Sequence, residues 1–159
     1  MIFVTLGTND KSFVRLLKAV EKLTASGVIR ERVVVQAGFT KYESSRMEVF
    51  ESVPADRFAA LMDEADLIIT HGGAGTIMTA LRKGKKIIGV PRLAKYHEHV
   101  NDHQKQLLSA FEERGYLIYA KDPSMLEEAI QKAADFRPAG FESNTANLTA
   151  YLNDWIREN

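Results

Sequence analysis

Short apolar runs alternate with segments of helical periodicity along most of the chain, and this alternation constrains the fold more than any other feature. The runs are rich in β-branched and other apolar residues, as is typical of buried strands. They lie at residues 2–6, 32–36, 47–53, 67–70, 86–90 and 116–119. Short apolar strands joined by helical crossovers form parallel sheets that are covered on both faces. The sequence therefore predicts a single doubly wound α/β domain.

The segments between the strands carry apolar residues at helical spacing. They predict helices at about 13–26, from 54 onward, and at 75–82, 101–114, 123–134 and 144–157. Asp10 and Ser12 are candidate N-caps of the first helix. The last helix has two interpretations: it packs on the domain's own sheet, which we favour, or it forms part of a docking face. Its apolar residues are Tyr151, Leu152, Trp155 and Ile156.

Composition excludes several classes of function. The 159 residues fit one domain, and 21 Lys plus Arg balance 21 Asp plus Glu, which argues against a general nucleic-acid binder. Without cysteine there is no disulfide or thiolate metal site, which suits a reducing cytoplasm. No apolar run has the length of a membrane span, and MIFVTLGTND lacks the basic segment of a signal peptide. We expect a cytoplasmic protein that reaches a membrane only through a partner.

Three polar or glycine-rich segments follow predicted strands: residues 7–9, 71–75 and 91–104. Because ligands of such sheets bind at the carboxyl ends of the strands, we expect these segments to converge. In the second segment, His71-Gly72-Gly73-Ala74-Gly75-Thr76 leads into a helix. Small residues allow close approach of a ligand, and a helix N-terminus attracts anions such as a diphosphate. A tight turn without a ligand explains the spacing equally well. The segment matches neither a Walker loop nor a dinucleotide fingerprint.

The third segment ends in His97-Glu98-His99-Val100-Asn101-Asp102-His103-Gln104. Asn101 and Asp102 are candidate N-caps of the next helix. Asp accepts hydrogen bonds from hydroxyls, and Gln both donates and accepts, so Asp102 and Gln104 suit a sugar. His99 and His103 are four residues apart, but the HExxH pattern is absent, and we predict no metal site. Taken alone, the histidines are more typical of solvated or structural residues than of catalytic ones.

The pattern HGGAGT…AL…GKKIIGVPR…HEHVNDHQ resembles the C-terminal domain of glycosyltransferase family 28. More narrowly, it resembles the Alg13-like subunits, which include exopolysaccharide and capsule glycosyltransferases of the PssE type. The resemblance extends from Ile2 to about Leu126. It implies a Rossmann-like domain that is the C-terminal, donor-binding half of a GT-B fold. It also implies that a separate Alg14-like, membrane-associated chain binds a lipid-linked acceptor and holds this chain at the inner face of the membrane. A homodimer of the isolated chain is a further expectation, since an unpaired half leaves a cleft face exposed.

The resemblance also implies roles for individual residues. Gly72, Gly73, Ala74, Gly75 and Thr76 would cradle the diphosphate of a UDP-sugar, with Gly7 and Thr8 beside it. His71 and His99 would lie near the phosphates, Asp102 and Gln104 would contact the sugar, and Arg92 would face the nucleotide or the partner. Many relatives have a ribose-binding glutamate where this chain has Thr79. UDP-galactose, UDP-glucose, UDP-glucuronate and UDP-N-acetylglucosamine remain possible donors.

The implied reaction is a direct displacement that inverts the anomeric centre, with UDP stabilised by the helix N-terminus and no metal or other cofactor. Its general base comes from the partner or from the candidates His71, Glu98 and His99. Two alternatives remain. The chain is a non-catalytic nucleotide-sugar-binding or regulatory module, which the missing glutamate favours slightly, or it is a dinucleotide-binding oxidoreductase, which the poor fingerprint disfavours.

Overall fold

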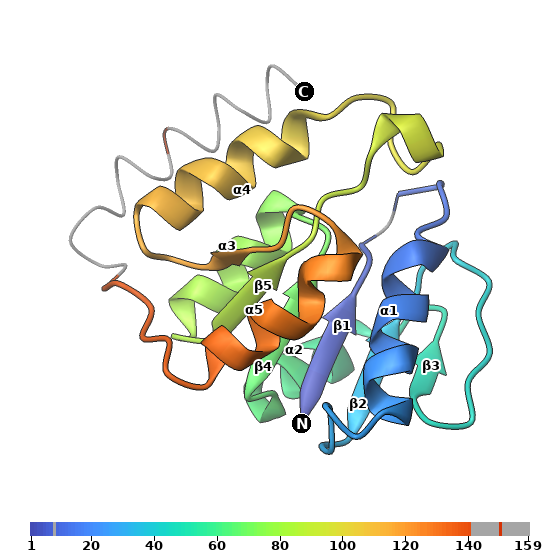
Figure 1. Cartoon of the computed structure of the whole chain (residues 1–159). Helices are drawn as coiled ribbons and strands as arrows, with labels where there is room; N and C mark the ends of the chain where they lie inside the picture. The colour runs from blue at the N-terminus through green and yellow to red at the C-terminus, as the bar shows by residue number, and fades with distance from the viewer. Residues whose placement is uncertain (8, 141–149, 151–159) are drawn as a thin grey trace.

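A computed structural model describes residues 1–7, 9–140 and 150, and its centre is a single six-stranded sheet. All neighbouring strands pair in parallel, in the order β3-β2-β1-β4-β5-β6 (Figure 1). The strands are β1 (Ile2–Thr5), β2 (Val33–Gln36), β3 (Glu48–Phe50), β4 (Leu67–Thr70), β5 (Lys86–Gly89) and β6 (Ile118–Tyr119). The six predicted strands and the doubly wound α/β fold are confirmed.

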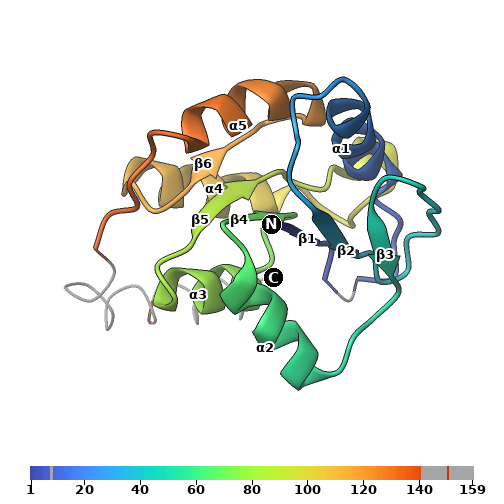
Figure 2. The same cartoon turned by 90° about the horizontal axis from the view of Figure 1, so that it is seen from below.

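Helices cover both faces of the sheet (Figure 2). They are α1 (Val14–Ala25), α2 (Ala55–Glu64), α3 (Ala74–Arg82), α4 (His103–Glu113) and α5 (Leu126–Ala133), with 3₁₀ turns η1 (Ala94–Tyr96) and η2 (Pro123–Met125). Because side chains alternate along a strand, β1 contributes to two cores. Ile2 and Val4 pack with α1 and α5, whereas Phe3 packs with α2, α3 and α4. This two-sided burial explains why the strands are apolar throughout.

The start of α1 differs from the sequence prediction. Within the described residues, no side chain caps α1, and Phe13 rather than Asp10 or Ser12 occupies its N-cap position. The Phe13 N–H donates instead to Thr40 Oγ1, 2.9 Å away, which follows β2. The predicted caps are therefore wrong, and the backbone at the start of α1 is instead bound to a residue 27 positions distant. The predicted helix at 144–157 lies outside the described residues.

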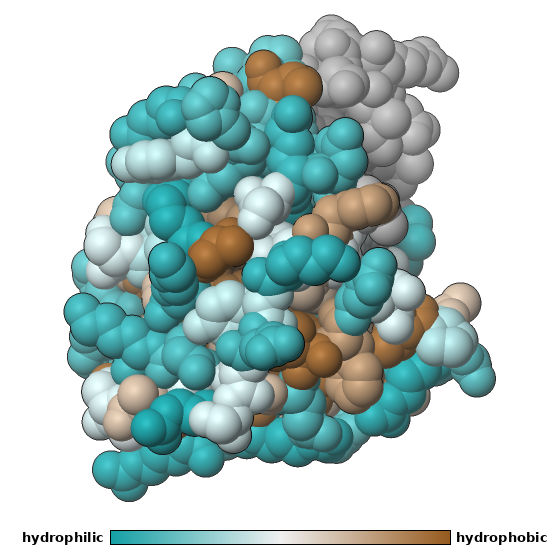
Figure 3. All heavy atoms as spheres, turned by 90° about the vertical axis from the view of Figure 1, so that its right-hand side faces the viewer, coloured by the Kyte–Doolittle hydropathy of each residue, from teal (hydrophilic) through white to brown (hydrophobic). Residues whose placement is uncertain are grey.

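The described helices include none that is both long and apolar enough to cross a membrane. On the side of α1 and β3, the surface is mainly hydrophilic, and hydrophobic residues gather in a few small areas (Figure 3). The large hydrophobic side chains that are exposed in the described residues all lie at or after the carboxyl end of a strand. They are Phe39, Phe50, Tyr96, Val100 and Met125. The large exposed hydrophobic side chains thus belong to the end of β3 and to the segments that follow β2, β5 and β6.

The order of the strands marks where a ligand would bind. From β1 the chain continues to β2 and β3 on one side, and from β4 it continues to β5 and β6 on the other. The direction of winding therefore reverses between β1 and β4. Doubly wound sheets bind ligands at such a switch point, outside the carboxyl ends of the strands.

Candidate functional site

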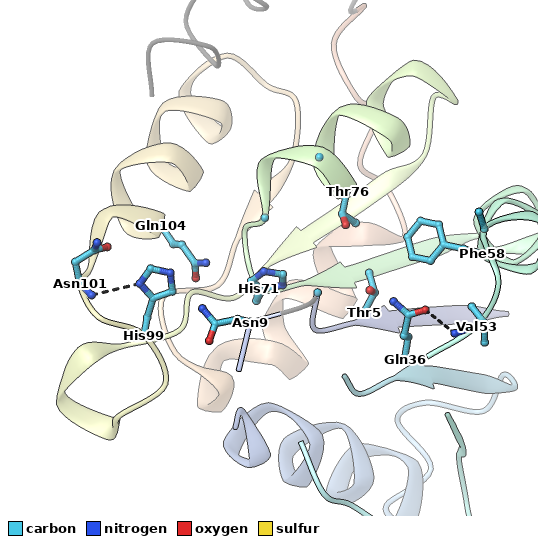
Figure 4. A pocket seen from close by; sticks show the side chains of 14 residues that line it. Thr5, Asn9, Gln36, Val53, Phe58, His71, Thr76, His99, Asn101 and Gln104 are labelled. Atoms are coloured by element: carbon cyan, nitrogen blue, oxygen red, sulfur yellow. Dashed lines mark hydrogen bonds between the residues drawn. The ribbon is translucent and has the colours of Figure 1, made fainter. Parts of the chain in front are cut away.

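A cavity of about 740 Å³ opens at this switch point. Its lining comes from the ends of β1 and β2, the start of α2, the glycine turn before α3, and the loop before α4 (Figure 4). The lining residues are Thr5, Gly7, Asn9, Gln36, Val53, Ala55, Phe58, His71, Gly73, Gly75, Thr76, His99, Asn101 and Gln104. The three segments predicted to converge therefore do so.

The structure brings together only part of the predicted site. Gly7, His71, Gly73, Gly75, Thr76, His99 and Gln104 line the cavity. Gly72, Ala74, Arg92, Glu98 and Asp102 lie outside the lining. Thr8 lies outside the described residues. The predicted segments are thus at the cavity, but several of their polar side chains are directed elsewhere.

The buried side chain of His71 packs between Gly7, which follows β1, and Gly73, which precedes α3. A Cβ atom at Gly7 would lie 2.5 Å from His71 Cε1, and a Cβ at Gly73 would lie 2.9 Å from the same atom. Gly7 also has a positive φ of 70°, which favours glycine. These two glycines are therefore required by the close approach of the imidazole, whether or not a ligand is bound.

Burial lowers the pKa of His71 to about 3, and the positive charge of Arg92 adds to this shift. The imidazole is consequently neutral at physiological pH and offers no charge to a phosphate. Burial likewise lowers the pKa of His99, again with a contribution from Arg92. His99 Nδ1 accepts a hydrogen bond from the Asn101 N–H at 3.3 Å, which fixes the ring tautomer.

The N-terminus of α3 faces the cavity with its first turn uncapped by any described side chain. Such a terminus leaves backbone N–H groups without intrahelical partners. Gly75 lies in this first turn, is exposed, and has no atom within 4 Å of the position of a Cβ. A glycine in a helix costs about 0.5–1 kcal/mol relative to alanine. Neither packing nor φ therefore requires a glycine at position 75, and the absent side chain leaves open space at the cavity.

Gln104 is buried in the first turn of α4, with its side chain directed at the cavity (Figure 4). Its Oε1 accepts a hydrogen bond from the Arg92 N–H at 3.0 Å, which leaves the amide NH₂ available as a donor. Asp102 is oriented differently. Its Oδ1 accepts from the Ala94 N–H at 2.9 Å, and it occupies the N-cap position of α4 without capping the helix. Asn101 Oδ1 accepts instead from the His103 N–H.

Arg92 and Glu98 are interior groups. Arg92 is 1% exposed, and its guanidinium donates to the carbonyl oxygens of Leu6, Lys11 and Glu98 at 2.7–3.2 Å. Burial lowers the pKa of Arg92 to about 10, so it remains a cation. Glu98 accepts two hydrogen bonds from Arg15, both at 2.9 Å. Neither side chain is placed to contact a ligand in the cavity.

Sequence reasoning assigned no role to Thr5, Gln36, Val53, Ala55 and Phe58. Thr5 and Gln36 end β1 and β2, so the strand ends themselves could have indicated them. The other three lie around the start of α2: Val53 precedes Pro54, and Ala55 and Phe58 are in the first residues of the helix. In the view of Figure 4, His71 separates a polar end, with Asn9, His99 and Gln104, from an end with Gln36, Val53 and Phe58. The described residues include no cluster of three or more histidines and carboxylates that could hold a metal ion.

A parallel sheet in this strand order, with a cavity at the switch point between β1 and β4, defines a Rossmann-like domain. The chain belongs to the glycosyltransferase family 28 C-terminal domain family, whose model matches residues 1–157. The resemblance inferred from the sequence is therefore confirmed.

Individual relatives agree with this assignment. The chain is 31% identical over 144 residues to the UDP-N-acetylglucosamine transferase subunit ALG13 of Candida glabrata, covering 88% of this chain and 64% of that protein. An ALG13 solution structure has a TM-score of 0.58 at 21% identity, covering 86% of this chain and 87% of that one. The calicheamicin glycosyltransferase CalG4 has a TM-score of 0.62 at 18% identity, covering 84% of this chain but only 33% of that one. The predicted fold class, one Rossmann-like half of a GT-B fold, is confirmed.

Proposed function

We propose that this chain is the donor-binding catalytic subunit of a two-chain, inverting glycosyltransferase that uses a UDP-sugar. The observation that carries the proposal is the cavity itself. Three features line one cavity of about 740 Å³: the uncapped N-terminus of α3, Gly75 with free space at its Cβ position, and the amide NH₂ of Gln104. These features match, in order, an anion, close backbone approach and a hydroxyl-bearing group.

The diphosphate is assigned to the start of α3. The free N–H groups of its first turn and the positive end of its dipole stabilise negative charge without a metal. Thr76 adds a hydroxyl, and Gly75 leaves room for phosphate oxygens. Thr79 is not among the residues that line the cavity, and its Oγ1 donates its hydrogen to the Gly75 carbonyl at 3.0 Å, so it offers the ribose no free donor.

The two ends of the cavity suit the two ends of the donor. Val53, Ala55 and Phe58 offer apolar surface for a base. At the other end, Gln104 offers its free NH₂ to the sugar, with Asn101 beside it. Asp102, the second predicted sugar contact, lies outside the lining and its Oδ1 accepts from the Ala94 N–H, so Gln104 and Asn101 are the stronger assignments.

Donor and setting extend the proposal further. UDP-N-acetylglucosamine is the first donor to test because the ALG13 relative carries that sugar in its name. We propose a lipid-linked acceptor held by an Alg14-like, membrane-associated partner, with exopolysaccharide or capsule biosynthesis as the setting. The exposed apolar residues at the carboxyl edge of the sheet provide a surface for that partner. The chain would then act in the cytoplasm, at the inner face of the membrane.

The general base is assigned to the partner, with His99 as the alternative. A pKa of about 3 makes His71 a weak base at neutral pH, and Glu98 is paired with Arg15 away from the cavity. No carboxylate is found among the described residues that line the cavity. The same observation favours the second candidate function, a non-catalytic nucleotide-sugar-binding module. Transfer by the reconstituted pair of chains that is lost in Gly75→Asp would support the first candidate, whereas transfer that survives Gly75→Asp would favour the second.

Calorimetric titration of the isolated chain with UDP, and then with UDP-sugars, tests the proposal with and without magnesium. Gly75→Asp should abolish binding, because it places a carboxylate at the phosphate position. Gly140→Asp is the matched control, since Gly140 is also exposed with open space at its Cβ position but lies outside the cavity. Gln104→Ala should weaken UDP-sugar binding more than UDP binding. Equal UDP affinity in the wild type and Gly75→Asp would overturn the assignment of the diphosphate.

A further inference from the structure

The wall of the cavity formed by residues 92–104 is attached to the rest of the domain by an ion pair between distant parts of the chain. Arg15 lies on α1, and Glu98 lies in the loop after β5, 83 residues later. The guanidinium Nε and Nη2 each donate to one carboxylate oxygen at 2.9 Å. This two-point geometry fixes direction as well as distance.

Both partners make further contacts that depend on the same geometry. Glu98 Oε1 also accepts from the Leu93 N–H at 3.0 Å, which closes the loop on itself. Arg15 Nη1 donates to Asp122 at 2.9 Å, and its guanidinium lies 4.2 Å from the centroid of the Tyr96 ring. The Glu98 side chain is 5% exposed and that of Arg15 is 24% exposed, so solvent screens the pair only partly.

The residue after Glu98 is His99, and Asn101 and Gln104 follow within six positions; all three line the cavity. No regular secondary structure connects Tyr96 to the start of α4 at His103. The position of this part of the wall therefore depends on where Glu98 is held. We infer that Arg15 and Glu98 are positioning residues, which act on the ligand through the loop and contact no substrate themselves.

This inference rests on the proposed function for its consequence in binding, but its structural part stands separately. If the pair positions the loop, Arg15→Ala should increase amide exchange at Leu93, Ala94 and Asn101, while exchange in β1 and β4 changes little. UDP-sugar affinity should fall about tenfold, within the range of coupling energies for residues linked through one hydrogen-bond network. Arg15→Lys keeps the charge but not the two-point geometry, so it should give a smaller loss.

Arg32→Ala provides the matched control. Arg32 also bridges two carboxylates, Glu48 and Glu64, but it lies at the amino edge of the sheet, away from the cavity. It should leave loop exchange and affinity near their wild-type values. The double variant Arg15→Ala/Glu98→Ala should bind UDP-sugar no more weakly than the single variant with the lower affinity, because the two residues act as one unit.

Each combination of amide exchange and affinity in Arg15→Ala either supports or overturns the proposal. Faster loop exchange together with weaker binding supports the proposal, and exchange no faster than in Arg32→Ala overturns it. Faster exchange with unchanged affinity also overturns it, because the loop would then not position the ligand contacts. If Arg15→Ala fails to fold, Arg15→Lys is measured in its place. If wild-type protein binds no UDP-sugar, the proposed function fails, and the exchange experiment alone decides whether the pair positions the loop.

Discussion

The two walls of the cavity are built on different physical principles, although each follows a central strand of the same sheet. One wall, residues 71–76 after β4, is here called the glycine wall; the other, residues 92–104 after β5, is called the loop wall. Close packing fixes the glycine wall, because the His71 ring leaves no room for a Cβ at Gly73. Buried charge fixes the loop wall, through Arg15 with Glu98 and through Arg92 with three carbonyl oxygens.

The two walls should therefore be sensitive to different kinds of substitution. Repulsion between atoms acts over tenths of an ångström, so the glycine wall should respond to single added methyl groups. A buried cation destabilises the fold when it loses its partners, and its partners are left unsatisfied when it is removed. The loop wall should therefore respond to lost charge and lost hydrogen-bond donors. Variants in the two walls should therefore fail in different assays.

The largest effect is expected for Arg92→Met in the loop wall. It removes the donor for the carbonyls of Leu6, Lys11 and Glu98 while it keeps most of the side-chain volume. We expect the free energy of unfolding in urea to fall by about 3 kcal/mol. Arg30→Met is the control, because Arg30 is exposed and donates to the single carbonyl of Gly27. Similar losses in the two variants would show that the buried hydrogen bonds contribute little.

A smaller effect is expected for Gly73→Ala in the glycine wall. The φ of Gly73 is −66°, so the backbone tolerates alanine, but the new Cβ would lie 2.9 Å from two atoms of the His71 ring. We expect unfolding to become easier by about 2 kcal/mol. In the background His71→Ala the same change should cost less, because the ring is absent. Additive losses in this double-mutant cycle, measured by urea unfolding, would contradict the steric origin.

The two walls also differ in how much of each could be predicted from the sequence. The six strands were predictable because buried parallel strands are apolar on both faces, and each face of β1 packs against helices. The glycine turn was recognisable because its residues are adjacent. The purpose of Gly73 was not predictable, since an anion cradle and a space for an imidazole require the same small residue.

The loop wall could be located but not assigned from sequence. The family resemblance implied that Arg92 faces the nucleotide or the partner and that Glu98 is a candidate general base. Their actual partners include Arg15 and the carbonyls of Leu6 and Lys11, more than 80 residues earlier in the chain. No local pattern encodes such pairs. The same reason applies to the start of α1, where Thr40 rather than a neighbouring side chain accepts the Phe13 N–H.

The smallest predicted effect concerns pH and again separates the walls. The folded pKa of His71 is about 3, whereas an unperturbed histidine titrates near 6.5. Between these values the unfolded chain binds a proton that the folded chain does not, so stability rises with pH across this window and is lost on acidification. From pH 7 to 5.5 this group should account for about 1 kcal/mol. His71→Asn should reduce the difference between urea unfolding curves at these two pH values by that amount. The contribution of His99 is present in both proteins and cancels. An unchanged pH dependence would mean that His71 is not a buried neutral group in the folded protein.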